Sequence, residues 1–129
     1  MNSEAPVTPV KGLDPVGVGA EHWWHERLSS VSTLLLMIWL GASLLRLPDL
    51  SYGMVTQWLT APINAVPMLL LIVSFFWHAK LGMQVIVEDY VHEDDNRILL
   101  LMLINFAIIA GAALALFSVL KIALGGSAA

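Results

Sequence analysis

The chain has 129 residues, of which 58% are hydrophobic and only 12% are charged. Soluble domains carry about 25% charged residues, so this chain has too little polar material for a surface that faces water on all sides. Its net charge is −4 and it has no basic patch, which argues against nucleic acid as a partner. The absence of cysteine excludes disulfides, iron–sulfur clusters and thiolate metal sites within the chain.

The N-terminal segment is weakly charged and rich in proline, glycine and valine, which predicts a flexible arm over 1–20. No cleavable signal peptide is apparent, because no basic start is followed directly by an apolar run. We therefore expect the chain to enter the membrane through its own first helix. The lack of a cationic, serine-rich presequence favours a bacterial inner membrane over a mitochondrial one.

Three apolar runs follow the arm, over about 28–45, 66–87 and 98–120. Each is close to the roughly 20 residues that a helix needs to cross a bilayer, and each is bounded by polar or helix-breaking residues. Three buried helices of a soluble protein would have no polar faces to surround them. The sequence therefore predicts an all-α integral membrane protein, with a three-helix anchor domain over 21–124 and a C-terminal tail over 125–129.

Two groups of small residues suggest how these helices pack. The third helix carries a stripe with four-residue spacing, which lets another helix approach closely: Ala107, Gly111 and Ala115. The first helix offers hydroxyl groups that allow the same approach or bond across it: Ser29, Ser32 and Thr33. The alternative is the ordinary composition of membrane helices. Three helices enclose little interior, so we expect them to pack against each other and a partner membrane subunit.

The orientation follows from the cations outside the spans. The arm and the second loop lie on one side of the membrane with Lys11, Arg27 and Arg97, and the other side carries Arg46 and Lys121. Three cations against two favour a cytoplasmic N-terminus under the positive-inside rule.

His78 is the residue that points most directly to chemistry. It lies near the middle of the second span, where an ionisable side chain is costly and therefore a functional candidate. Neutral imidazole is the least costly such group and a good ligand for heme iron. A histidine that only hydrogen-bonds a neighbouring helix is the plain alternative.

The helical period places two further residues on the face of His78. At about 100° per residue, Gly82 lies roughly 40° away and Asp89 roughly 20° away. Gly82 leaves room for a porphyrin or a helix, and Asp89 reaches the membrane surface about 16 Å along the axis. Lys80 points away from this face and is expected to extend toward the headgroups.

The topology adds a polar group at one membrane surface, because the first helix starts where the second ends. We expect cations, an acid and a phenol to gather there, in a set that suits a quinone headgroup or heme propionates: His22, His25, Arg27, Asp89, Tyr90 and His92. Interfacial aromatics and a solvated acidic loop are the plain interpretations of the same residues.

Two segments resemble the membrane anchor chains of succinate dehydrogenase, respiratory complex II. The segment 78–91 has a histidine, a glycine four residues on, and Asp-Tyr at eleven and twelve, as in the D-type small chain of that family. The segment 22–27, together with Ser29 and Ser30, resembles the family's entry to its first helix. Three spans and this length also fit, and the resemblance covers nearly the whole chain after the arm.

The resemblance implies that this chain and a second, C-type membrane subunit hold one heme b and bind ubiquinone, while anchoring a flavoprotein and an iron–sulfur subunit. His78 would be one axial ligand of the heme iron, with Gly82 beside it and Arg27 facing the propionates or the quinone. Tyr90 would hydrogen-bond a quinone carbonyl, and Asp89 would tune it or move protons. The chain has no flavin or nicotinamide motif, so succinate oxidation belongs to another subunit.

Two other hypotheses remain open at this stage. One is a heme-free structural anchor of a respiratory complex, in which His78 merely packs. The other is a small cytochrome b, which usually needs paired histidines on facing helices, whereas only His78 lies within a span.

Overall fold

The computed structural model describes residues 15–125 as four helices, α1 (Pro15–Leu45), α2 (Tyr52–Thr60), α3 (Pro62–Tyr90) and α4 (Asp94–Gly125). Three of them contain stretches long and apolar enough to cross a membrane: Gly19–Leu45, Pro62–Tyr90 and Asp94–Gly125. The described part of the chain has no strand. The predicted all-α membrane fold with three spans is therefore confirmed.

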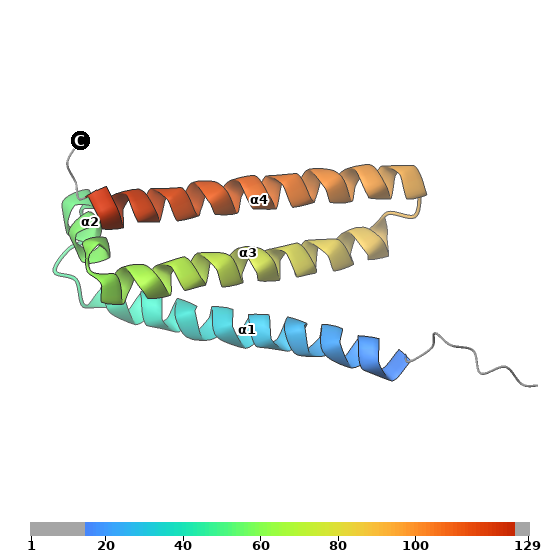
Figure 1. Ribbon diagram of the computed structural model, residues 1–129, viewed down its shortest axis with the longest axis horizontal. Coiled ribbons are helices and arrows are strands. Elements are labelled where there is room, and N and C mark those ends of the chain that lie inside the picture. Colours follow the sequence, from blue (N-terminus) through green and yellow to red (C-terminus); the bar gives the residue numbers. More distant parts are fainter. Residues whose placement is uncertain (1–14, 126–129) are drawn as a thin grey trace, which may run out of the picture.

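The three long helices lie side by side with α3 in the middle, and the short helix α2 covers one end (Figure 1). α3 packs against both α1 and α4, while α1 and α4 make no close backbone approach within residues 15–125. Hydrophobic side chains on the outer faces are mostly exposed, among them Phe106, Ile109 and Phe117 of α4. Lipid or other subunits must cover such surfaces.

The observed helices are longer than the predicted spans. Helix α1 begins at Pro15, so residues 15–20, which the sequence predicted to belong to a flexible arm, are helical; proline is well suited to the first turn of a helix. Residues 1–14 of the predicted arm and 126–129 of the predicted tail lie outside the described residues. Helix α4 begins at Asp94, because acidic residues in the first turn favour a helix N-terminus.

Helix α2 was not predicted from the sequence. It begins after Ser51, whose side chain accepts a hydrogen bond from the backbone N–H of Met54 at 3.4 Å. Its buried residues are Thr56 and Leu59, which lie three residues apart and so share one face. At its other end, Asn64 of α3 donates to the Trp58 carbonyl at 3.0 Å and satisfies one of the unpaired carbonyls there.

The small core lies at the end that α2 covers. Leu59, Ile72 and Val119 come from α2, α3 and α4 and form one buried cluster. The indole rings of Trp39 and Trp58 stack with centroids 5.7 Å apart, which ties α1 to α2. The opposite end of the layer, where α3 ends and α4 begins, is not part of this cluster.

The predicted small-residue stripe of α4 packs against α3. A Cβ placed on Gly111 would lie only 3.0 Å from Cε1 of Phe76, which shows how closely the two helices approach. Ala115 packs against the buried cluster, whereas Ala107 is exposed. The prediction of close helix packing is confirmed for Gly111, whose neighbour is Phe76 of α3 in the same chain.

Candidate functional site

The ring of His78 lies against two serines of α1. Its Nδ1 atom is 3.5 Å from Oγ of Ser29 and 3.4 Å from Oγ of Ser30. One turn further, the hydroxyls of Ser32 and Ser74 lie 3.3 Å apart in a hydrogen bond between the two helices. Ser29 and Ser32 thus contact α3 through their hydroxyls, which is one of the two roles predicted for these residues, whereas Oγ1 of Thr33 is buried and has no hydrogen-bond partner among the described residues.

These contacts fix how α1 and α3 are aligned. Ser32 meets Ser74 while Ser29 meets His78, so the two helices run in opposite directions. Arg27, two residues before Ser29, is therefore level with about Lys80. Asp89 lies roughly nine residues beyond that level, or about 13 Å along the axis. The predicted gathering of Arg27 with Asp89 and Tyr90 is therefore wrong, since Arg27 lies near the level of His78.

The hydroxyl protons of both serines are directed along α1. Oγ of Ser29 donates to the Glu26 carbonyl at 2.8 Å, and Oγ of Ser30 donates to the same carbonyl at 2.9 Å. A hydroxyl has one proton and two acceptor lone pairs. Toward His78, the two serines therefore present acceptor oxygens.

The face of α3 that carries His78 is open. The imidazole is exposed, and a Cβ placed on Gly82 would meet nothing within 4 Å. With Nδ1 turned to the serines, Nε2 is the ring nitrogen left for a ligand. This donor arrangement fits a heme iron, because a metal-bound histidine usually directs its other nitrogen to a hydrogen-bond acceptor.

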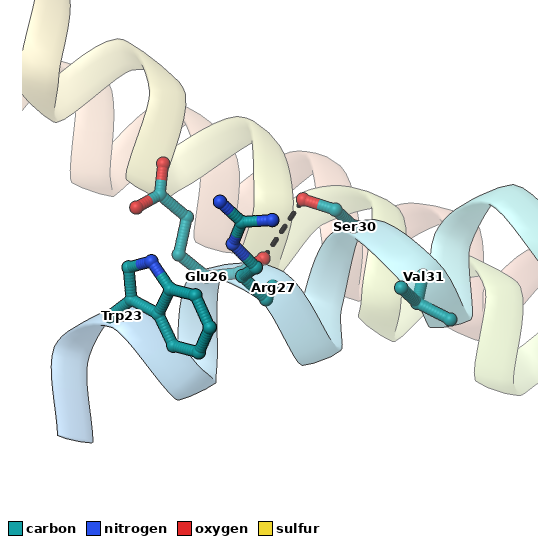
Figure 2. Close-up of a pocket in the computed structure, with 5 residues that line it drawn as sticks. All are labelled: Trp23, Glu26, Arg27, Ser30 and Val31. Atoms are coloured by element: carbon teal, nitrogen blue, oxygen red, sulfur yellow. Dashed lines mark hydrogen bonds between the residues drawn. The ribbon is translucent and has the colours of Figure 1, made fainter. Parts of the chain in front are cut away.

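A hollow of about 340 Å³ lies beside Ser30 on α1. It is lined by Trp23, Glu26, Arg27, Ser30 and Val31, which are drawn in Figure 2 with the bond from Ser30 to the Glu26 carbonyl. The guanidinium of Arg27 lies 4.6 Å from the Trp23 ring centroid, a cation–π contact. Ser30 lines this hollow together with Arg27 and also contacts His78, so the Arg27 guanidinium lies on the part of α1 that contacts the candidate heme ligand.

A second polar group lies where α3 ends. Tyr90 is the last helical residue and is 80% exposed, and Asp89 beside it is exposed as well. Among the described residues, neither the phenol nor this carboxylate has a hydrogen-bond partner. The helix is closed by the backbone N–H of Val91, which donates to the Val87 carbonyl at 2.9 Å. Both side chains are thus available to a ligand at the end of α3.

The other predicted polar residues do not form one cluster with His78 in the described part of the chain. His25 lines a smaller hollow with Ser29, Ser74 and Trp77, while His22 and His92 are exposed. The contact of the serine pair with His78 was missed at the sequence level. Its only signal was the presence of two adjacent hydroxyls on a span that has to face α3.

Lys80 contacts an aromatic ring on its own helix. Its Nζ lies 5.5 Å from the Trp77 ring centroid, a distance at which the ring face attracts a cation. This contact offers the ammonium group a partner besides the headgroups toward which it was expected to extend. Within residues 15–125, no cluster of three or more His, Asp or Glu side chains is arranged to hold a bare metal ion.

Comparison with known proteins identifies relatives over most of the chain. The family model for the succinate dehydrogenase/fumarate reductase transmembrane subunit matches residues 1–120. The succinate dehydrogenase hydrophobic membrane anchor subunit of Rickettsia bellii is 30% identical over 87 residues, which cover 67% of this chain and 70% of that protein. The corresponding subunit of Rickettsia conorii is 28% identical over 102 residues, covering 77% and 81%.

A relative from Reclinomonas americana, named a succinate dehydrogenase membrane anchor subunit, shows a similar degree of identity. It is 30% identical over 90 residues, which cover 67% of this chain and 75% of that protein. No solved structure matches the chain.

Proposed function

The chain belongs to the family of succinate dehydrogenase/fumarate reductase transmembrane subunits, and from this premise we propose that it co-binds heme b and contributes to a ubiquinone site. Electrons from succinate oxidation would thereby reach quinone in the membrane. The observation that carries the heme proposal is the position of His78, whose Nδ1 faces serine oxygens while the open side of α3 lies beside it.

Three residues would hold the heme from this chain. His78 would coordinate the iron through Nε2, and Gly82 would leave space for the porphyrin one turn along the same face. Arg27 would pair with the propionates, because the helix alignment brings it near the level of His78 and a guanidinium binds carboxylates in a forked geometry. The bound heme would supply a one-electron redox centre, and the partner membrane subunit would complete the heme site.

Tyr90 and Asp89 would serve the quinone. Reduction of a quinone to a quinol takes two electrons and two protons, and the protons have to come from the aqueous edge of the membrane. The exposed phenol of Tyr90 is placed to donate a hydrogen bond to a quinone carbonyl, and the carboxylate of Asp89 is placed to pass protons from water. Both lie at the end of a span, where a headgroup and water meet.

The chain would work as one part of a larger complex. Its sequence has no nucleotide-binding motif and no cysteine for an iron–sulfur cluster, so a flavoprotein and an iron–sulfur subunit would oxidise succinate and deliver the electrons. A C-type membrane subunit would cover apolar faces of the helix layer, which are exposed in the chain by itself.

The membrane would be a bacterial inner membrane, in keeping with the Rickettsia relatives. The N-terminus would face the cytoplasm, the orientation that the cations of the sequence predict when Arg27 is counted on that side. The end of α3 at Tyr90 and the beginning of α4 at Asp94 would then lie on the cytoplasmic side.

The quinone role is tested by Tyr90→Phe in the purified complex, with two electron acceptors compared. We expect reduction of ubiquinone by succinate to fall about tenfold, because a hydrogen bond worth about 1–1.5 kcal/mol is lost. Reduction of an artificial dye that takes electrons upstream of the quinone should not change. Tyr52→Phe, at another exposed tyrosine on the opposite end of the layer, is the matched control. Equal loss with both acceptors would indicate failed assembly and contradict the assignment.

A further inference from the structure

Two serines of α1 meet one nitrogen of the candidate heme ligand, and neither is itself placed to bind iron. Oγ of Ser29 and of Ser30 lies 3.5 and 3.4 Å from Nδ1 of His78. Ser29 is buried and Ser30 is half-buried, so both lie within the contact between α1 and α3. The question is which partner supplies the proton in these two contacts.

Both serine hydroxyls donate their protons to the Glu26 carbonyl of α1. Each Oγ lies at 2.8 or 2.9 Å from the Glu26 carbonyl, within the usual range for an O–H donor, whereas the distances to Nδ1 are longer, at 3.5 and 3.4 Å. A carbonyl can only accept, so each serine must donate to it. The remaining proton between the serines and the ring therefore lies on Nδ1.

This position of the proton decides which nitrogen can bind a metal. A neutral imidazole carries its proton on one ring nitrogen and a lone pair on the other. With the proton on Nδ1, the lone pair is on Nε2, which faces away from α1. With the proton on Nε2, the ring would be unable to coordinate iron without first exchanging it.

We propose that Ser29 and Ser30 are positioning residues that fix His78 as the Nδ1–H tautomer and so present the Nε2 lone pair to the heme iron. This inference rests on the proposed heme function. The serines provide the outer acceptor that metal-bound histidines commonly use, here with hydroxyl oxygens in place of a carboxylate. They also couple the packing of α1 against α3 to the orientation of the ring.

The tautomer can be measured without heme, in the chain with both serines in place. The full-length chain, labelled with ¹⁵N-histidine and placed in lipid nanodiscs at neutral pH, should give a His78 signal with its proton on Nδ1. The signal is assigned by its disappearance in His78→Gln. A proton on Nε2 in the unaltered chain would overturn the inference.

Substitution of the serines tests their part in heme binding within the assembled complex. In Ser29→Ala/Ser30→Ala we expect heme affinity to fall about tenfold, at the lower end for outer-shell partners because the contacts are long. The heme midpoint potential should shift upward, because the ring loses an acceptor that makes it a stronger donor to oxidised iron. Ser29→Thr/Ser30→Thr keeps both hydroxyls and should restore both properties.

Ser32→Ala is the matched control. It removes a serine bond between the same two helices, to Ser74, but leaves His78 untouched, so the heme potential and content should stay unchanged. If Ser29→Ala/Ser30→Ala keeps the unaltered potential and affinity while His78→Ala loses the heme, the inference is overturned and the proposed function stands. If His78→Ala keeps the heme, both are overturned.

Discussion

The close approach of α4 to α3 at Gly111 allows the packing of the span that carries His78 to be tested quantitatively. A Cβ on Gly111 would lie 3.0 Å from Cε1 and 3.4 Å from Cζ of Phe76, whereas carbon atoms pack at about 3.5–4.0 Å. For Gly111→Ala, the ring has to retreat by about half an ångström, and a gain in helix propensity of up to about 1 kcal/mol offsets the cost. For Gly111→Leu, the branched side chain enters the space of the ring, and we expect a loss of about 1–3 kcal/mol.

The free energy of unfolding is measured by titrating the full chain in mixed micelles with dodecyl sulfate and following helical circular dichroism. Gly41→Leu is the control, because a Cβ on Gly41 meets nothing within 4 Å. Phe76→Ala removes the obstructing ring, so Gly111→Leu should cost less in that background, with a coupling free energy of at least about 0.5 kcal/mol. Additive costs, or an equal loss at Gly41, would refute the packing argument.

Two further predictions concern charged groups, one in the loop that follows α1 and one within α1. The pKa of Asp49 lies below its ordinary value of 3.8, because the Ser51 hydroxyl, and to a smaller extent the Ser51 backbone N–H, donates a hydrogen bond to the carboxylate. These hydrogen bonds stabilise the folded chain above pH 3.8, and this stabilisation is lost as the pH falls through the lowered pKa. Carboxyl NMR titration should show this, and Ser51→Ala should raise the pKa toward 3.8, whereas an unmoved value would contradict the cause. In the complex, Arg27→Gln should weaken heme retention about tenfold, and Arg27→Lys should retain heme better than Arg27→Gln but less well than the unaltered complex. Full heme retention in Arg27→Gln would contradict the assignment of Arg27 to the heme site.

The three spans were predictable from the sequence because the bilayer imposes a length and an apolar composition that local runs of residues reveal. Their ends were not, because helix termini depend on caps and on the membrane surface. Asp94 starts α4 well before its apolar run, and Pro15 starts α1 within the expected arm. Helix α2 has only nine residues of mixed polarity, and the Ser51 cap was its one local signal.

Those features of the candidate site that depend on a single helix could be predicted from the sequence. Those that depend on how two helices are aligned could not. The period of α3 places His78 and Gly82 on one face, and both lie on the exposed side of the helix. The contact of His78 with the serine pair and the level of Arg27 depend on how α1 is aligned with α3. That alignment is set by tertiary contacts such as Ser32 with Ser74, which no local pattern encodes.

The proposed role of His78 in binding heme iron is tested most directly by the visible absorption spectrum of the purified complex after reduction with dithionite. We expect the bands of a b-type heme in the unaltered complex and in His92→Ala, where the substituted histidine follows the end of α3. In His78→Ala these bands should be lost or strongly weakened while the partner subunits still co-purify. Undiminished bands in His78→Ala would contradict the assignment and leave the chain a membrane anchor whose histidine only packs against α1.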